Sequence, residues 1–176
     1  MRLKLFSYKK VKSTNDVAIR KIRLKKKQGI IISEEQTNGR GRYGKKWISI
    51  KGNLFLTIFF QINLRSNIEK LTIFNCEIVK RALSIFIKKN IKIKYPNDIY
   101  LNKKKLCGIL QEILNYKGKK YIIIGIGVNI VDSPLIKNYN TTFVNKNVKK
   151  IITKDMVFSK LKKFYEINIY KLKKCI

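Results

Sequence analysis

A glycine-rich segment between two apolar runs constrains the fold most strongly. The segment Gly39-Arg-Gly-Arg-Tyr-Gly-Lys-Lys-Trp47 follows the run 29–35 and precedes the run 53–62. Its letters match G-x-G-x-x-G and nearly match G-x-x-x-x-G-K-[ST], and both patterns open a helix in nucleotide-binding folds. Here β-forming residues and a turn follow, no acidic residue stands near position 60, and Lys46 takes the Ser or Thr position. The context therefore argues against both nucleotide-binding folds.

The spacing of apolar residues predicts mostly hairpin-connected strands with a few helices. A helix is expected to start at Ser13 and run to about Lys27, where Gly29 stops it. We expect strands at 3–8, 29–35, 53–62, 91–95, 100–102, 105–114 and 121–130, a hairpin turn at 115–120, and two further helices at 68–89 and 155–172. This order indicates an α+β domain with helices packed on one face of the sheet.

Length and the absence of targeting signals suggest a single cytoplasmic domain. The 176 residues suit one domain, 1–176. No uncharged apolar run is long enough for a transmembrane helix, and the N-terminus lacks the apolar stretch of a signal peptide. We therefore expect a cytoplasmic protein with no membrane partner.

The net charge of +31 is compatible with a nucleic-acid-binding surface. The chain is, however, also rich in Ile and Asn, which share A- and T-rich codons with Lys, and its lysines are scattered along the sequence. A biased codon usage explains this charge without a polyanionic partner, so no specific binding to DNA is expected.

Several classes of chemistry are excluded by the residues present. There is no histidine, which rules out Ser-His-Asp and Cys-His triads and histidine general bases. The cysteines Cys76, Cys107 and Cys175 lack the C-x-x-C spacing of zinc or redox sites. An enzyme with this sequence would rely on Lys, Arg, Asp, backbone amides or a metal held by oxygen.

Three clusters carry candidate chemistry. In the glycine-rich segment, backbone amides and the side chains of Arg40 and Arg42 suit an anion, while Trp47 offers a flat face to a purine. The second cluster is Lys94-Tyr-Pro-Asn-Asp-Ile-Tyr-Leu101 followed by Lys105-Leu-Cys-Gly-Ile-Leu110, and the third is Gly125-Ile-Gly-Val-Asn129. Each cluster in isolation also fits a plain structural turn, loop or strand.

The clusters in combination, with Ser13-Thr14-Asn15 before them, occur in an order and at separations that resemble the biotin protein ligases. The resemblance extends from about residue 7 to the last helix. It implies a mixed β-sheet with helices on one face. It also implies a reaction in two steps: biotin and Mg-ATP form biotinyl-5'-AMP, and a lysine of a biotin carboxyl carrier protein then takes the biotin. That carrier is a part of acetyl-CoA carboxylase, and a homodimer is a further expectation.

The resemblance also assigns roles to individual residues. It implies that Lys105, Arg42 and Asp98 are catalytic, and that no separate metal site is needed. Biotin would contact Ser13, Thr14, Asn15, Gln36, Gly39, Arg40, Arg42, Lys105, Leu106 and Gly108. ATP or the adenylate would contact Arg40, Arg42, Trp47, Asn97, Lys105, Gly125, Gly127 and Asn129.

The sequence departs from the family pattern in places. Tyr95 stands where the family commonly has Trp, and the pair Lys45-Lys46 replaces a single basic residue. Neither a winged-helix domain before the first strand nor a β-barrel domain after the last helix is expected. Three alternatives stay open: a lipoate or octanoate ligase on the same fold, a basic nucleic-acid-binding protein, and an inactive remnant of the family.

Overall fold

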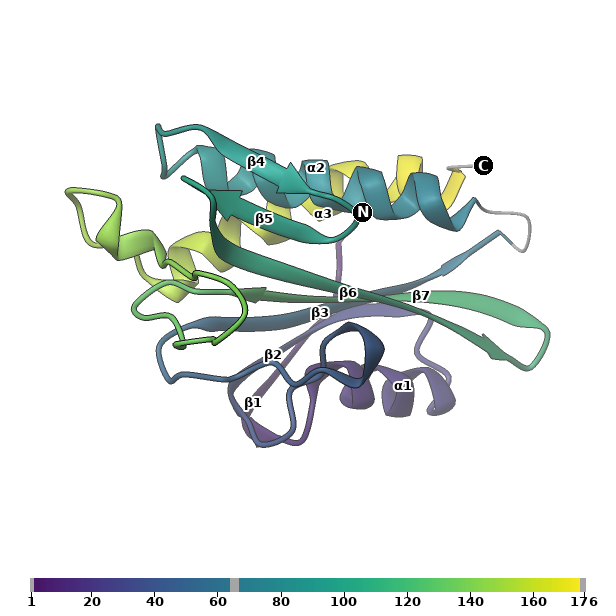
Figure 1. Ribbon diagram of the computed structural model, residues 1–176. Helices are drawn as coiled ribbons and strands as arrows, with labels where there is room; N and C mark the ends of the chain where they lie inside the picture. Colours follow the sequence, from purple (N-terminus) through teal and green to yellow (C-terminus); the bar gives the residue numbers. More distant parts are fainter. Residues whose placement is uncertain (1, 64–66, 175–176) are drawn as a thin grey trace.

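A seven-stranded sheet organises residues 2–63 and 67–174, the part of the chain that the computed structural model describes. Its strand order is β1-β2-β3-β7-β6-β5-β4 (Figure 1). The strands are β1 (Leu5–Val11), β2 (Gln28–Gln36), β3 (Leu54–Ile62), β4 (Ile91–Lys94), β5 (Asp98–Leu101), β6 (Lys104–Tyr116) and β7 (Lys119–Val128). The pair β1–β2 is parallel and every other pair is antiparallel, so the sheet is mixed, as predicted.

The helices cover both faces of the sheet. On one face, α2 (Ile68–Ser84) and α3 (Lys154–Lys174) pack over the larger core (Figure 1). On the other face, α1 (Thr14–Arg23) buries Val17, Ala18 and Ile22 against a smaller cluster that includes Phe59. The expected α+β class is confirmed, and the expectation of a shared face holds for α2 and α3 but not for α1.

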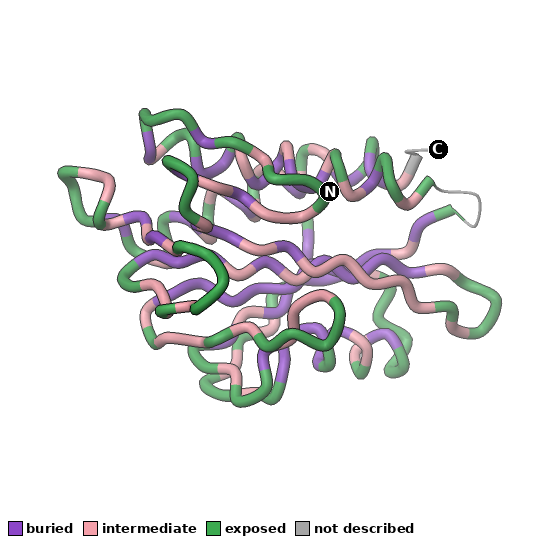
Figure 2. Tube along the Cα trace, in the orientation of Figure 1, coloured by how far each residue is buried: buried purple, intermediate pink, exposed green. Residues whose placement is uncertain are grey.

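The two apolar cores explain why α1 takes the opposite face. Side chains of β3 alternate between them, with Ile58 and Phe60 in the larger core and Phe59 in the smaller one. Because both faces of β3 are covered, nearly the whole strand is buried (Figure 2). An uninterrupted apolar strand therefore needs helices on both sides.

The first helix ends earlier than the sequence predicted. It stops at Arg23, and Lys25 then adopts a left-handed backbone conformation with φ of 61°. Gly29 does not end the helix but lies inside β2, where a Cβ atom would come within 2.9 Å of the Phe6 and Phe59 rings. The glycine therefore makes room for aromatic packing.

Two tight turns set the register of the β5–β6–β7 ribbon. Asn102 and Lys103 both have positive φ, as do Lys117 and Gly118. Positive φ at both central residues is the signature of the type I′ turn, which favours two-residue hairpins. The hairpin predicted at 115–120 is thus confirmed, and a second one precedes β6. Within residues 2–63 and 67–174, no helix has the length and apolar character needed to cross a membrane.

Candidate active site

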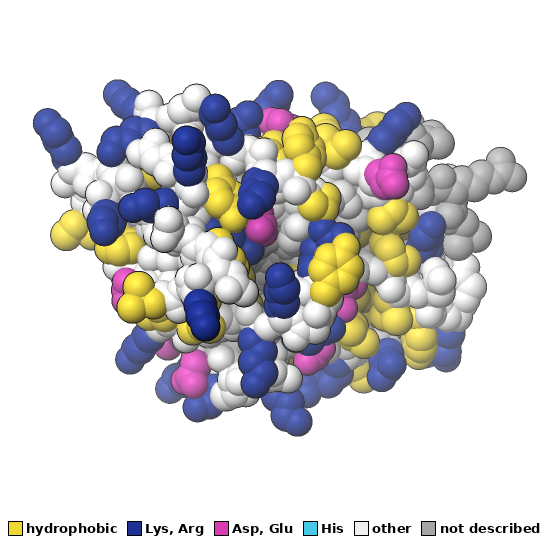
Figure 3. All heavy atoms as spheres, viewed as in Figure 1, with side chains coloured by type: hydrophobic (Ala, Val, Ile, Leu, Met, Phe, Trp, Pro, Cys, Tyr) yellow, Lys and Arg dark blue, Asp and Glu magenta, His cyan; other side chains and the backbone are white. Residues whose placement is uncertain are grey.

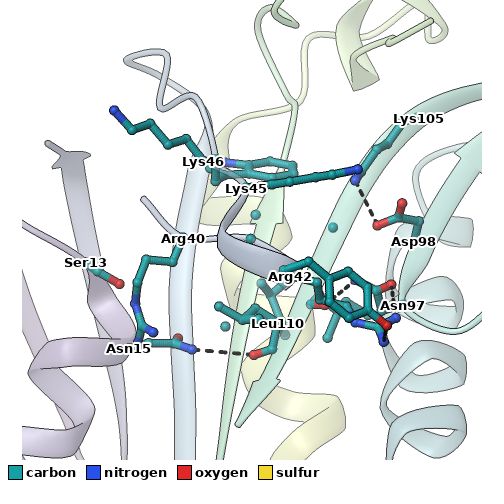
Figure 4. A pocket seen from close by; sticks show the side chains of 18 of the residues that line it. Ser13, Asn15, Arg40, Arg42, Lys45, Lys46, Asn97, Asp98, Lys105 and Leu110 are labelled. Carbon is teal, nitrogen blue, oxygen red and sulfur yellow. Dashed lines mark hydrogen bonds and ion pairs between the residues drawn. The ribbon is translucent and has the colours of Figure 1, made fainter. Parts of the chain in front are cut away.

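A cavity of about 380 Å³ lies on the face of the sheet that α1 only partly covers. Its cover is the glycine-rich loop, residues 37–52, and its floor includes parts of β6 and β7 (Figures 1 and 4). The cavity is within the range typical of small-molecule sites, roughly 300–1,000 Å³. Most of the predicted site residues line it: Ser13, Thr14, Asn15, Gln36, Arg40, Arg42, Trp47, Asn97, Asp98, Lys105, Gly108, Gly125 and Gly127.

The glycine-rich loop folds as a small hairpin and not as the start of a helix. The Gly41 N–H donates to the Lys45 carbonyl at 2.6 Å, and the Trp47 N–H donates to the Gly39 carbonyl at 2.9 Å. A short 3-10 turn, Arg42–Gly44, closes its tip. Tyr43 and Gly44 in this turn have φ of 55° and 71°. The sequence-based rejection of both nucleotide-binding folds is consistent with this geometry.

Arg40 is held by two carboxylates. Its Nη1 and Nη2 atoms each lie 2.8 Å from one oxygen of Glu112, and Nη2 also lies 2.9 Å from Asp16 Oδ1. The side chain extends from the loop towards Asn15 (Figure 4). Arg40 lines the cavity as predicted, but in this structure its terminal nitrogens contact carboxylates of the protein.

Arg42 and Asn97 connect the loop to the far side of the cavity. Arg42 Nη1 donates to Asn97 Oδ1 at 3.1 Å, and Nη2 donates to the Tyr43 hydroxyl at 2.8 Å (Figure 4). Asn97 Nδ2 in turn donates to the Ile109 carbonyl of β6 at 2.8 Å. Two of the side chains predicted to hold the adenylate therefore lie next to each other.

Trp47 covers two of the site glycines. A Cβ atom at Gly108 would lie 2.7 Å from the indole, and one at Gly127 would collide with the same ring. At Gly125, a Cβ atom would collide with the side chain of Asn15. The prediction was that Gly125 and Gly127 let the strand approach a ligand. In this structure both glycines line the cavity, and their missing side chains leave room for Asn15 and Trp47.

A β-bulge directs Lys105 into the cavity. Ile99 pairs with Cys107 and Tyr100 pairs with Lys105, so Leu106 is an extra residue in β6. Such a bulge reverses the alternation of faces along a strand. Gly108 therefore shares the cavity face with Lys105, whereas Leu106 is fully buried in the core of the other face.

Lys105 and Asp98 form an ion pair inside the cavity. The Lys105 Nζ atom lies 2.9 Å from Asp98 Oδ1, and both side chains are mostly buried (Figure 4). Lys105 Nζ also lies 5.8 Å from the centre of the Trp47 ring and 5.2 Å from that of Tyr139. A cation is thus fixed against aromatic faces. We call Arg42, Asn97, Asp98 and Lys105 the charged end of the cavity.

Uncharged polar side chains form the opposite part of the lining. The Thr14 backbone N–H and hydroxyl both lie within 3.0 Å of Gln36 Oε1. Ser13 precedes the helix and makes no side-chain capping bond, and Asn15 is buried. We call Ser13, Thr14, Asn15 and Gln36 the neutral end of the cavity.

Three expected contact residues do not line the cavity: Gly39, Leu106 and Asn129. Gly39 packs under the loop, where a Cβ atom would meet the Trp47 carbonyl. The bulge turns Leu106 into the core. Asn129 is buried beyond the end of β7, where its Nδ2 donates to the Thr142 carbonyl at 3.2 Å.

Several residues of the site were missed by sequence reasoning. Glu112 and Asp16 contact Arg40, and Tyr139 lies beside Lys105. Glu112 was accessible to such reasoning, because it is an acidic residue in the apolar strand 105–114 and lies an even number of residues after Gly108. Tyr139 belongs to an aperiodic polar loop and gave no such signal.

The described cysteines are unsuited to nucleophilic chemistry. Burial, reinforced by the negative charge of Asp98, raises the pKa of Cys76 to about 12. Full burial raises the pKa of Cys107 well above its ordinary value. Both thiols therefore stay protonated at neutral pH, whereas the thiolate is the nucleophile. Across residues 2–63 and 67–174, no group of three or more Cys, Asp or Glu side chains is arranged to hold a metal ion.

Comparisons with known proteins agree with this geometry. Residues 7–129 match the model of the biotin/lipoate A/B protein ligase family. The chain is 33% identical over 123 residues to the bifunctional ligase/repressor BirA of Escherichia coli, a match that covers 68% of this chain and 38% of that protein. It is 31% identical over 126 residues to the human biotin–protein ligase, covering 63% and 17%. The chain thus spans well under half the length of these relatives.

Solved structures show the same fold. A biotin protein ligase from Aquifex aeolicus, in complex with biotin and ATP, has a TM-score of 0.78 and 29% identity, covering 97% of this chain and 72% of that one. The ligase from Leishmania major, in complex with biotinyl-5-AMP, has a TM-score of 0.78 and 26% identity, covering 98% and 81%. The chain therefore belongs to the biotin/lipoate A/B protein ligase family, whose model matches residues 7–129.

Proposed function

We propose that this chain is a biotin protein ligase: it activates biotin with Mg-ATP to biotinyl-5'-AMP and transfers biotin to a lysine of a biotin carboxyl carrier protein. The observation that carries the proposal is the division of one cavity into a neutral end and a charged end. A relative from Paracoccus denitrificans, 32% identical over 113 residues, is named a biotin–[acetyl-CoA-carboxylase] ligase, which supports this class of carrier.

The neutral end suits the ureido ring of biotin. This ring carries N–H donors and a carbonyl acceptor but no charge. Hydroxyl and amide groups at Ser13, Thr14 and Gln36 offer both donors and acceptors. Because buried polar groups need hydrogen-bond partners, this end favours an uncharged polar ring over a purely apolar head. That preference supports biotin over lipoate or octanoate as the substrate.

The charged end suits the reaction between the biotin carboxylate and ATP. In the first step, a carboxylate oxygen attacks the α-phosphorus, and the bond from that phosphorus to the pyrophosphate oxygen breaks. Negative charge builds up on the α-phosphate during this step. Lys105, held by Asp98, and the guanidinium of Arg42 are positioned to offset it. Mg²⁺ belongs to the nucleotide substrate.

The second step transfers biotin to the carrier. The lysine amine of the carrier attacks the carbonyl carbon of the mixed anhydride, and the bond from that carbon to the AMP oxygen breaks. AMP leaves as a stable anion, so the enzyme needs no covalent nucleophile. This matches the protonated state of Cys76 and Cys107. Asp98, mostly buried at the charged end, would orient the amine and accept its proton.

The test is incubation of the protein with biotin, Mg-ATP and a biotin carboxyl carrier domain, followed by a streptavidin blot and mass measurement of the carrier. The expected result is a single biotin on one lysine, absent without ATP. Octanoyl or lipoyl addition in place of biotin would instead establish the alternative ligase. No acylation, together with nucleic-acid binding that weakens steeply with salt, would establish the basic binding protein.

A further inference from the structure

Glu112 of β6 has no role in the proposed reaction, yet it makes the most extensive ionic contact with the glycine-rich loop. Its two oxygens accept one hydrogen bond each from Arg40 at 2.8 Å, a paired geometry with high specificity. Asp16 contacts the same guanidinium at 2.9 Å. The chain has 10 acidic and 41 basic residues, so two of its few carboxylates serve one arginine. Two carboxylates on one guanidinium indicate that the position of the Arg40 side chain is important for this site.

The contact fixes the base of the loop. Arg40 and Lys46 pair across the loop hairpin, and the Trp47 N–H donates to the Gly39 carbonyl beside them. Trp47 rests on Gly108, while Arg40 binds Glu112, four residues further along β6. Side chains separated by an even number share one face of a strand. The hairpin therefore has two anchors on the same face of β6, one aromatic and one ionic.

The same carboxylate is linked to the neutral end of the cavity. Asn15 Nδ2 donates to Glu112 Oε2 at 2.6 Å, and the Thr57 hydroxyl donates to Asn15 Oδ1 at 2.6 Å. Thr57 Oγ1 lies 2.8 Å from Thr14 Oγ1. Asn15, Thr57 and Thr14 are 2%, 0% and 4% exposed. A buried chain of hydrogen bonds thus runs from Glu112 to the part of the cavity assigned to the ureido ring.

Glu112 fixes the orientation of the Asn15 amide in this chain. Because Nδ2 of Asn15 donates to the carboxylate, Oδ1 faces the hydroxyl of Thr57. Thr57 and Thr14 each have one hydroxyl proton, and these two protons serve the contacts of Thr57 with Asn15, of Thr57 with Thr14, and of Thr14 with Gln36 Oε1. The orientation of Asn15 therefore bears on the hydrogen bonds of the neutral end.

We propose that Glu112 is a positioning residue: it holds Arg40, and with it the glycine-rich loop, over the cavity, and it orients Asn15 at the neutral end. Its effect on retention of the adenylate rests on the proposed function. Its effect on the order of the loop does not, so the two can be measured separately.

The first experiment is hydrogen exchange of the ligand-free protein with a Glu112→Gln substitution. Glutamine keeps the size but presents an NH₂ group to Arg40 or Asn15, which are both donors. The amides of Gly41, Lys45 and Trp47 should exchange about tenfold faster or more, as expected when a hydrogen bond to a charged group is lost. The matched control is Glu77→Gln, which removes a surface ion pair with Lys80 on α2. Unchanged exchange in Glu112→Gln would overturn the proposal.

Asp16→Asn provides a second, milder variant. Asp16 is about half exposed and contributes only one of the contacts to Arg40. It should raise exchange of the same amides in the same direction but by less. If Glu112→Gln does not fold, this variant still decides the question, because faster exchange supports the ionic anchor and unchanged exchange contradicts it.

The second experiment measures release of preformed biotinyl-5'-AMP. Glu112→Gln should release it about ten- to hundredfold faster and raise the KM for biotin more than it lowers kcat. Glu112→Asp should restore part of the retention, because the carboxylate remains. In a double-mutant cycle, Glu112→Gln should add little to Arg40→Gln, since both remove the same contact. Additive losses would overturn the proposal. A wild-type protein that forms no adenylate would refute the proposed function and leave the exchange experiment to decide the role of Glu112.

Discussion

Lys105 depends on one extra residue in β6 for its place in the cavity. The bulge at Leu106 turns Lys105 to the cavity face, where Asp98 pairs with its ammonium group. Lys103 and Lys104 precede the bulge and are exposed. The basic run 103–105 therefore contains one lysine of the site and two surface lysines.

Lys105→Ala should slow formation of the adenylate by about a hundredfold or more, the scale lost with one preorganised donor. Lys103→Ala and Lys104→Ala should have little effect, because solvated charges contribute little. Single-turnover release of pyrophosphate measures all three variants. Equal and mild losses would make Lys105 one more surface lysine.

Arg42→Ala should weaken retention of the adenylate more than it weakens folding. Arg42 is half-buried, and its guanidinium contacts Asn97 and the exposed Tyr43, whose hydroxyl and ring it meets within the same loop. Substitutions at the surface usually change stability by less than about 0.5 kcal/mol, so the free energy of unfolding should change little. Thermal unfolding of the free protein and the rate of adenylate release are the two measurements. A large fall in the unfolding temperature would assign Arg42 a structural role instead.

At the level of elements, the glycine-rich loop is a hairpin held to the sheet at its base, with a tip that projects over the cavity. Tyr43 at the tip is 86% exposed, whereas Arg40 and Trp47 contact β6. Positive φ at Tyr43 and Gly44 leaves the tip with a conformation that most residues adopt reluctantly. Ordering such a tip becomes favourable when an anion binds its amides and Arg42.

The loop, residues 37–52, should therefore exchange amide hydrogens faster without ligand than with biotinyl-5'-AMP. The slowing should be greatest at the tip, Arg42–Gly44, because the base is already anchored. Hydrogen exchange by mass spectrometry, or protease cleavage at Arg42, provides the measurement. Equal protection with and without the adenylate would contradict closure of the loop over the ligand.

Gly127→Ala should displace Trp47, the single tryptophan of the chain. The new Cβ atom would collide with the indole, while β7 itself can accept alanine. We expect a shifted tryptophan emission and about tenfold weaker binding of ATP, with the far-ultraviolet circular dichroism unchanged. Gly118→Ala is a control for adding a methyl group, because nothing lies within 4 Å of its Cβ position, although its φ of +69° adds local strain. An unchanged emission in Gly127→Ala would show that the ring is not seated as described.

At the level of the whole molecule, the basic charge is widely distributed over the face that Figure 3 shows. Lysine and arginine side chains spread over the visible face and do not gather in one patch (Figure 3). A nucleic-acid interface would concentrate them along one surface. The visible distribution is consistent with the explanation from codon usage. Three of the chain's ten acidic residues contact basic residues of the site: Asp98 pairs with Lys105, and Asp16 and Glu112 pair with Arg40.

The sequence was a good guide where local patterns decide structure. Turn residues and apolar periodicity predicted the hairpin at 115–120, because both depend on short stretches of chain. The resemblance carried by the order of the motifs implied the mixed sheet and a shared site for Arg42, Asp98 and Lys105, which line one cavity. It misplaced Leu106, because a bulge cannot be read from alternation alone.

The sequence patterns also did not predict contacts between segments that lie far apart in the chain. The ion pair of Arg40 with Glu112 joins residues 72 positions apart. The position of α1 on the opposite face depends on how both sides of β3 are covered. Such features follow from tertiary packing and not from local propensity.

The most direct test of the central claim is the carrier assay with matched variants. Wild-type protein, biotin, Mg-ATP and a biotin carboxyl carrier domain should yield one biotin per carrier on one lysine, detected by streptavidin and by mass. Lys105→Ala should yield about a hundredfold less in the same time, and Lys103→Ala should match the wild type. A wild-type protein that leaves the carrier unmodified, or attaches lipoate or octanoate in place of biotin, would contradict the account.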